Sequence, residues 1–85
     1  MKKKNKMIGR KVVHPRLLSW VKINPELEVD YGSHYAKKLG RTDFLIYMGE
    51  IPNQRGHCII FNQDTQKMHV GYHIETFVEM TEDET

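Results

Sequence analysis

The sequence predicts a mainly β domain of five short strands, with one long first connection that contains a short helix. Short runs of β-branched and aromatic residues alternate with turn-forming residues from residue 43 onward. Residues 15–42, in contrast, show no lasting alternation. A chain of 85 residues with 39% hydrophobic side chains encloses one small core. We therefore expect one domain at residues 7–80, between a basic disordered tail at residues 1–6 and an acidic tail at residues 81–85.

The first strand is predicted over residues 7–14, where β-branched residues stop at Pro15. Residues 15–42 follow as a long excursion, interrupted by Pro25. Within it, Ser33 is placed to cap a short helix over residues 34–39, and Gly40 suits the position after its last turn. Loops longer than about 12–15 residues in a compact domain are usually functional. We therefore expect residues 15–42 to form the recognition surface.

The C-terminal half reads as a meander. Residues 43–51 form an apolar run of strand length, residues 52–56 form a turn, and residues 57–62 return as the next strand. Residues 63–66 are a tight polar turn before the alternating strand of residues 67–73. That alternation predicts Met68, Val70 and Tyr72 on one face, and Lys67, His69, Gly71 and His73 on the other. Residues 74–77 suit a single tight turn, and residues 78–80 a last short strand.

This order of elements resembles the SH3-like small barrels, on residues 9–13, 45–49, 59–61 and 71–79. The resemblance implies a five-stranded barrel whose loops bind peptides, RNA, DNA or another protein. The chain lacks the acidic, aromatic-rich loop that signalling SH3 domains use for proline-rich peptides, so proline-motif binding is not expected. Residues 47–53, 56–58 and 71–73 also look like small uncharacterised proteins of phages and bacteria, a resemblance that supplies no site residues.

Charge is distributed unevenly along the chain. Residues 1–16 carry seven Lys or Arg and no acid, whereas residues 75–85 carry five acids and no Lys or Arg. The basic end has two interpretations, a solubilising tail or an arm for phosphates or an acidic protein surface. No apolar run approaches the length of a membrane helix, and no apolar segment of a secretory signal follows Met1. A cytoplasmic location is expected, and the single Cys58 agrees with a reducing environment.

The sequence contains no enzyme signature. It has neither a Gly-rich phosphate loop nor a nucleophile elbow, and Cys58 lies in an apolar strand where burial raises the pKa of a thiol. Cys58, His57, His69 and His73 fall in adjacent predicted strands. His69 and His73 share a strand face but stand about 13 Å apart, too far for one metal ion. His57 and Cys58 do not complete a site, because neighbouring residues of a strand point to opposite faces. We interpret the strand histidines as solvent-facing. The sequence therefore predicts no catalytic residue, metal or cofactor, and no small-molecule substrate is evident.

A basic and aromatic constellation remains. Trp20 has two interpretations, a ring that plugs the end of the barrel or a surface ring for stacking on bases. Arg55 stands at a predicted hairpin tip beside polar residues. The candidate binding residues are Arg10, Lys11, Arg16, Trp20, Lys22, Tyr31, Tyr35, Lys37, Lys38, Arg41 and Arg55.

These features predict a non-catalytic binding module, a regulatory protein of phage or bacterial type. We expect it to bind another protein through the long loop and the hairpin tip, with aromatic and Arg side chains as anchors. The alternative is binding of RNA or single-stranded DNA through the basic and aromatic face.

Overall fold

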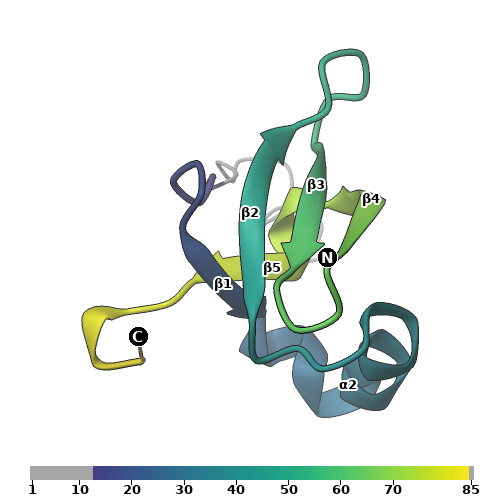
Figure 1. The fold of residues 1–85 in the computed structure, drawn as a ribbon, viewed down its shortest axis with the longest axis vertical. Coiled ribbons are helices and arrows are strands. Elements are labelled where there is room, and N and C mark those ends of the chain that lie inside the picture. The colour runs from purple at the N-terminus through teal and green to yellow at the C-terminus, as the bar shows by residue number, and fades with distance from the viewer. Residues whose placement is uncertain (1–12, 85) are drawn as a thin grey trace, which may run out of the picture.

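The computed structural model describes residues 13–84, which form a five-stranded antiparallel sheet with a helix at one end (Figure 1). The sheet order is β4-β3-β2-β1-β5, so the last strand returns beside the first. The prediction of a mainly β domain is confirmed. The sheet is not closed, because β4 and β5 remain as its two edges. The elements in chain order are β1 (Trp20–Ile23), α2 (Pro25–Leu39), β2 (Leu45–Glu50), β3 (His57–Asn62), β4 (Lys67–His73), the 3-10 turn η1 (Ile74–Thr76), β5 (Phe77–Glu79) and the 3-10 turn η2 (Glu82–Glu84).

The predicted first strand falls largely outside the described residues. So do the candidate residues Arg10 and Lys11 and the predicted basic tail at residues 1–6. Residues 13 and 14, which belong to that predicted strand and are described, have no regular secondary structure.

β1 lies inside the segment that was predicted to be an irregular connection. Its Val21 is opposite Leu45 of β2 on one side and Glu79 of β5 on the other. β1 is therefore a central strand of the sheet, and the prediction of a loop at this position is wrong. The strand is only four residues long, too short to show a convincing alternation.

The helix is also longer than predicted, because α2 covers 15 residues rather than residues 34–39. Pro25 does not interrupt the chain. It occupies the start of α2, where its missing N–H removes no helical hydrogen bond. Asn24 caps the helix, since its side-chain oxygen accepts a hydrogen bond from the Glu26 N–H at 3.0 Å. Ser33 lies in the helix interior instead of capping its start.

The C-terminal meander agrees closely with the sequence. The bounds of β3 and β4 are those predicted, β2 lies within its predicted range, and η1 is the expected single turn. β5 begins one residue earlier than the predicted last strand. Residues 82–84, within the segment expected to be an acidic tail, form η2.

A β-bulge at Gly71 changes which side chains of β4 share a face. Cys58 is opposite Tyr72, whereas the next residue of β3, Ile59, is opposite Val70, so Gly71 is the extra residue. Its positive φ of 98° is a conformation that glycine adopts without strain. The predicted common face of Met68, Val70 and Tyr72 is therefore wrong for Tyr72, which packs against the core.

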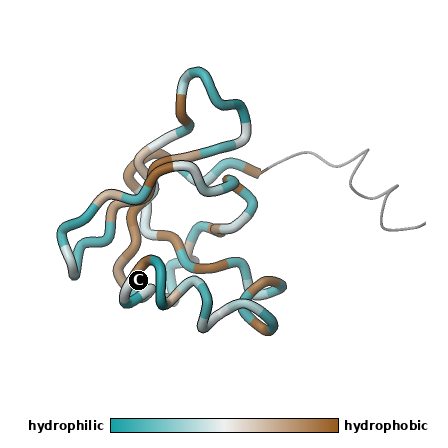
Figure 2. The backbone as a smooth tube through the Cα atoms, turned by 90° about the vertical axis from the view of Figure 1, so that its right-hand side faces the viewer, coloured by the Kyte–Doolittle hydropathy of each residue, from teal (hydrophilic) through white to brown (hydrophobic). Residues whose placement is uncertain are grey.

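The core lies on one face of the sheet. Figure 2 shows hydrophilic stretches at the tips of the hairpins and more hydrophobic stretches where the strands lie together. Leu39, from the last turn of α2, is buried there, and Leu27 and Tyr35 of the same helix pack against the buried cluster. The buried hydrophobic residues are Val21, Ile23, Leu39, Leu45, Tyr47, Cys58, Ile60, Ile74 and Phe77.

The buried amide of Asn62 connects the sheet to the end of α2. Its Nδ2 donates to the carbonyl oxygens of Leu39 and Arg41, at 2.7 and 2.8 Å. Its Oδ1 accepts from the backbone N–H groups of Asp64 and Thr65, at 2.9 and 3.2 Å. One side chain with 0% exposure thus satisfies four backbone groups from two separate segments.

Replacement of Asn62 by Ala is expected to lower the free energy of unfolding by about 2–4 kcal/mol, because it leaves buried donors and acceptors unpaired. Urea unfolding measures the change. The matched control is Gln63→Ala, whose side chain is exposed and whose effect is expected within about 0.5 kcal/mol. Equal stability of the two variants would contradict this account of the Asn62 network.

Candidate functional site

The face of the sheet opposite the core is apolar over four strands. Residues of β2 and β3 alternate between buried and partly exposed, so every second side chain points away from the core. We call this surface the apolar outer face. It consists of Trp20 from β1, Ile46 and Met48 from β2, Ile59 and Phe61 from β3, and Met68 and Val70 from β4.

The strand register aligns these side chains in a row. Trp20 is opposite Ile46, Ile46 is opposite Phe61, and Phe61 is opposite Met68. Antiparallel sheets with one covered face normally present polar side chains on the other. Here Trp20 is 36% exposed, Met68 55% and Val70 62%. The other four residues of the outer face are partly exposed. Exposed apolar patches are typical of interaction surfaces.

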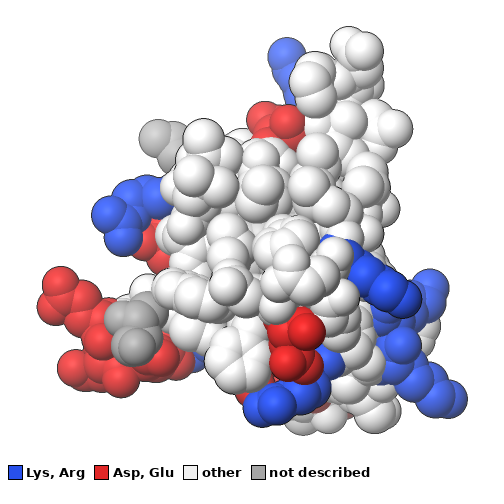
Figure 3. All heavy atoms as spheres, viewed as in Figure 1, with Lys and Arg blue, Asp and Glu red and all other residues white. Residues whose placement is uncertain are grey.

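Few charged side chains cover this part of the molecule. In Figure 3, the surface over β1, β2 and β3 is largely free of Lys, Arg, Asp and Glu, which gather along its margins. Of the two interpretations of Trp20, the structure agrees with a surface ring, because Trp20 is exposed on the side of β1 opposite the buried Val21.

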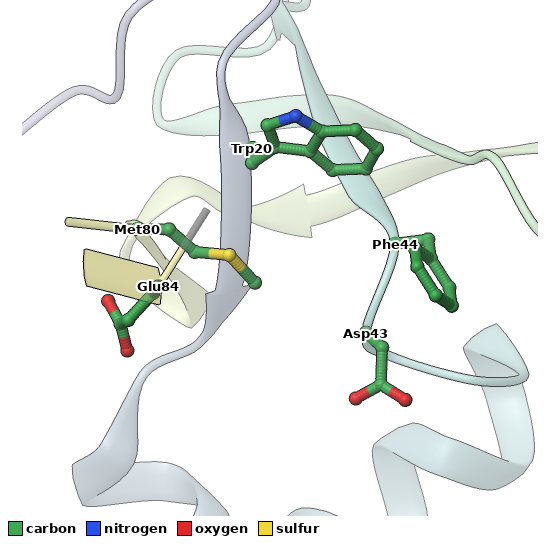
Figure 4. A pocket seen from close by; sticks show the side chains of 5 residues that line it. All are labelled: Trp20, Asp43, Phe44, Met80 and Glu84. Carbon is green, nitrogen blue, oxygen red and sulfur yellow. The ribbon is translucent and has the colours of Figure 1, made fainter. Parts of the chain in front are cut away.

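An open hollow of about 160 Å³ lies at one end of the outer face, between Trp20, Phe44 and Met80 (Figure 4). The rings of Trp20 and Phe44 meet edge to face, with centroids 6.4 Å apart. Asp43 and Glu84 also line the hollow, but their carboxylates point away from the two rings. Small-molecule pockets typically measure roughly 300–1,000 Å³. This hollow suits a single apolar side chain better than a cofactor.

Ion pairs surround the hollow and occupy three of the candidate cations. The Arg16 side chain donates to Glu79 at 2.8 Å, and the Arg41 side chain to Asp43 at 3.0 Å. Hydrogen bonds from the backbone N–H and then the side chain of Arg16 hold the pKa of the Glu79 carboxyl below its usual value.

The third pair joins β1 to the C-terminal turn. Lys22 donates to Glu84, whose other carboxylate oxygen accepts from the Thr81 N–H at 2.8 Å. The hydrogen bond from Lys22 is the main reason that the pKa of Glu84 is lowered to about 2. η2 is thereby attached to the sheet beside the hollow. The guanidinium of Arg41 also lies over the Phe44 ring, 5.0 Å from its centroid.

The remaining candidate residues do not gather with these. Tyr35 is turned toward the core, where its ring lies 6.3 Å from that of Tyr72. Tyr31, Lys37 and Lys38 are exposed on α2. Arg55 is exposed at the β2–β3 hairpin tip, which lies at the top of Figure 1, whereas α2 lies at the bottom. α2 and the hairpin tip thus stand at opposite ends of the sheet.

The sequence reasoning missed most of the outer face, although a signal was present. Residues 44–48 and 58–61 are continuous apolar runs rather than alternating ones. Such runs are typical of strands that are apolar on both faces. They were interpreted only as evidence for strands, and not as evidence for a second apolar surface.

The expectation of solvent-facing strand histidines is confirmed for His73, which is exposed, and is wrong for His69. His69 is opposite Ile60, which is buried, and the His69 Nε2 atom is buried with no hydrogen-bond partner among the described residues. His57 and His73 form a cross-strand pair instead. Within residues 13–84, no group of three or more His, Cys, Asp or Glu side chains is arranged to hold a metal ion.

Cys58 is fully buried, as the sequence predicts. Burial, with a smaller contribution from Glu50, raises the pKa of its thiol from 9.0 to about 11. The thiol is therefore protonated at neutral pH and inactive as a nucleophile.

No protein-family model, curated protein or solved structure matches this chain. In the part of the chain that the structure describes, no helix has the length and hydrophobicity to cross a membrane.

The raised pKa of Cys58 predicts a loss of stability in alkali. The unfolded thiol ionises near pH 9 and the folded thiol near pH 11, so the free energy of unfolding should fall as the pH rises between these values. Urea unfolding at several pH values measures the slope. Cys58→Ala should reduce it, leaving the part that comes from Tyr47 and Tyr72, whose pKa values burial also raises. An unchanged slope in the variant would contradict this assignment.

Proposed function

We propose that this chain is a non-catalytic binding module that engages another protein through its apolar outer face. The observation that supports this most directly is the row formed by Trp20, Ile46, Phe61 and Met68 across four strands. Burial of apolar surface contributes about 25 cal/mol per Å², and aromatic residues dominate the energetics of protein interfaces. A partner that covers this row therefore gains more binding free energy from the row than from the charged margins.

The chemistry of the partner follows from the surroundings of the outer face. The hollow between Trp20, Phe44 and Met80 accepts one apolar side chain. The acidic turn η2 stands beside it, attached through Glu84. The partner is therefore a protein with an apolar surface that carries basic side chains along the border facing η2.

The segment predicted to recognise the partner keeps a role in this proposal. Trp20 belongs to residues 15–42, and α2 from the same segment borders one end of the sheet. The hairpin tip with Arg55 borders the other end. Because the outer face lies between these two borders, it is the surface that can join them in one contact.

We also propose that the fold is an SH3-like barrel that remains open. The order of the strands supports this, since β2, β3 and β4 form a meander and β5 follows a single 3-10 turn to lie beside β1.

Nucleic-acid binding is less well supported. Arg16, Lys22 and Arg41 each donate to a carboxylate, and a phosphate placed beside these carboxylates is repelled. Lys37 and Lys38 are exposed, but they lie at the end of α2 rather than on the aromatic surface.

Three substitutions on the outer face test the protein-binding proposal. Proteins retained from a cell lysate by the immobilised chain are purified and titrated one at a time by calorimetry. We expect Trp20→Ala to weaken the affinity of a true partner by at least about tenfold, and Met68→Ser and Val70→Ser to weaken it measurably. The matched control is Val29→Ser, because Val29 is 84% exposed on α2 and lies outside the outer face.

The same titrations distinguish the alternatives. Nucleic-acid binding would replace the proposal if the chain binds single-stranded RNA or DNA with an affinity that depends on Lys37 and Lys38. That affinity should also fall steeply with salt, by roughly 0.7–0.9 log units per log unit of salt for each neutralised phosphate. Reversible self-association that Trp20→Ala abolishes would assign the outer face to a second copy of the chain. Equal binding by the outer-face variants and the control would overturn the proposal.

A further inference from the structure

Two histidines face each other at one end of the β3–β4 pair. His57 and His73 are directly opposite in the register, and their ring centroids are 4.3 Å apart with an interplanar angle of 38°. His57 is partly buried and His73 is exposed, so solvent and ions reach the pair. The two rings belong to adjacent strands, as the sequence predicts, and the register places them directly opposite each other.

The distance between the rings suits a shared metal ion. Imidazole nitrogens bind zinc at about 2.0–2.1 Å, so two nitrogens on one ion stand within about 4 Å of each other. The two ring centroids are 4.3 Å apart, so the rings are close enough for one nitrogen of each to turn toward a shared ion. The pair His69 and His73, on one strand, cannot do so, because four strand residues span about 13 Å.

A backbone contact leaves one nitrogen of His57 free for a metal. Its Nδ1 lies 3.1 Å from the carbonyl oxygen of Arg55. Because a carbonyl oxygen only accepts hydrogen bonds, Nδ1 carries the proton in this contact, and in the neutral ring Nε2 holds the lone pair. Metal-ligating histidines typically donate their second ring N–H to a carbonyl or carboxylate in this way.

The backbone that carries the pair is held on both sides. The carbonyl oxygen of His57 accepts from the Ile51 N–H at 2.8 Å, and the carbonyl oxygen of Gly56 accepts from the Ile74 N–H at 2.8 Å. These bonds fix the residues next to both histidines. Little backbone entropy is therefore lost when the two rings turn toward one ion.

We propose that His57 and His73 form a two-histidine site for a divalent transition-metal ion of the Zn²⁺, Ni²⁺ and Cu²⁺ group, with water at the remaining positions. Imidazole is a preferred ligand of these ions. Among the described residues, no third His, Cys, Asp or Glu completes the site. Its affinity is therefore lower than that of structural zinc sites with four protein ligands. The ion would cross-link the ends of β3 and β4, on the same side of the sheet as Ile59 and Val70 of the outer face.

Zinc chloride titrated into the full chain tests the site, with the imidazole signals of all five histidines followed by NMR. We expect the signals of His57 and His73 to shift together and to saturate at one ion per chain. His57→Ala and His73→Ala should each lower the affinity by at least about tenfold. His34→Ala is the matched control, because His34 is exposed on α2 and its ring lies against Tyr35. This variant should leave the affinity unchanged.

Paramagnetic Ni²⁺ broadens the NMR signals of residues close to it. Broadening in the unsubstituted chain therefore locates the ion even where an alanine variant fails to fold. Broadening centred on His57 and His73 supports the proposal. Broadening centred on other residues, or zinc affinity that is equal in the folded His73→Ala variant and the unsubstituted chain, overturns it. Neither result bears on the outer-face contact, which the variants of Trp20 and Met68 test separately.

Discussion

The side-chain amide of Asn62 is the interaction on which the arrangement of helix and sheet depends. It binds backbone groups at the end of α2 and in the β3–β4 turn, so it fixes where the chain leaves the helix and where the sheet reverses. Leu39 is thereby held in the core, and its carbonyl is satisfied by Nδ2 instead of by water. A polar residue in the interior thus determines the geometry of an otherwise apolar cluster.

The small size of the chain relative to its sheet determines that one face of the sheet stays exposed. A strand that is apolar on both faces needs two covering layers. The described residues supply one, in which α2 and η1 contribute Leu39 and Ile74 to the core. The other face keeps Trp20, Met68 and Val70 in contact with water. The same sheet therefore serves both as the wall of the core and as the surface for which a binding role is proposed.

The sequence predicted the meander well, because turn chemistry and strand length specify it locally. The sequence-based prediction was wrong where one residue type is typical of two different structures. Pro25 both breaks and begins helices, and only the cap provided by Asn24 distinguishes the two cases. The face of a strand residue could not be predicted beyond Gly71, because a bulge reverses the alternation without a distinctive pattern. The pairing of His57 with His73 depends on that register. The two histidines could therefore be placed on adjacent strands from the sequence, but not opposite each other.

The bulge has a further consequence for the behaviour of the chain in solution. β4 is an edge strand with two exposed apolar side chains, a combination that recruits foreign strands and seeds fibrils. At Gly71 the extra residue interrupts the even spacing of backbone donors and acceptors and increases the local twist. An incoming strand therefore finds a regular template only over residues 67–70, the part of the edge that carries Met68 and Val70, and the bulge limits how far such pairing extends along β4.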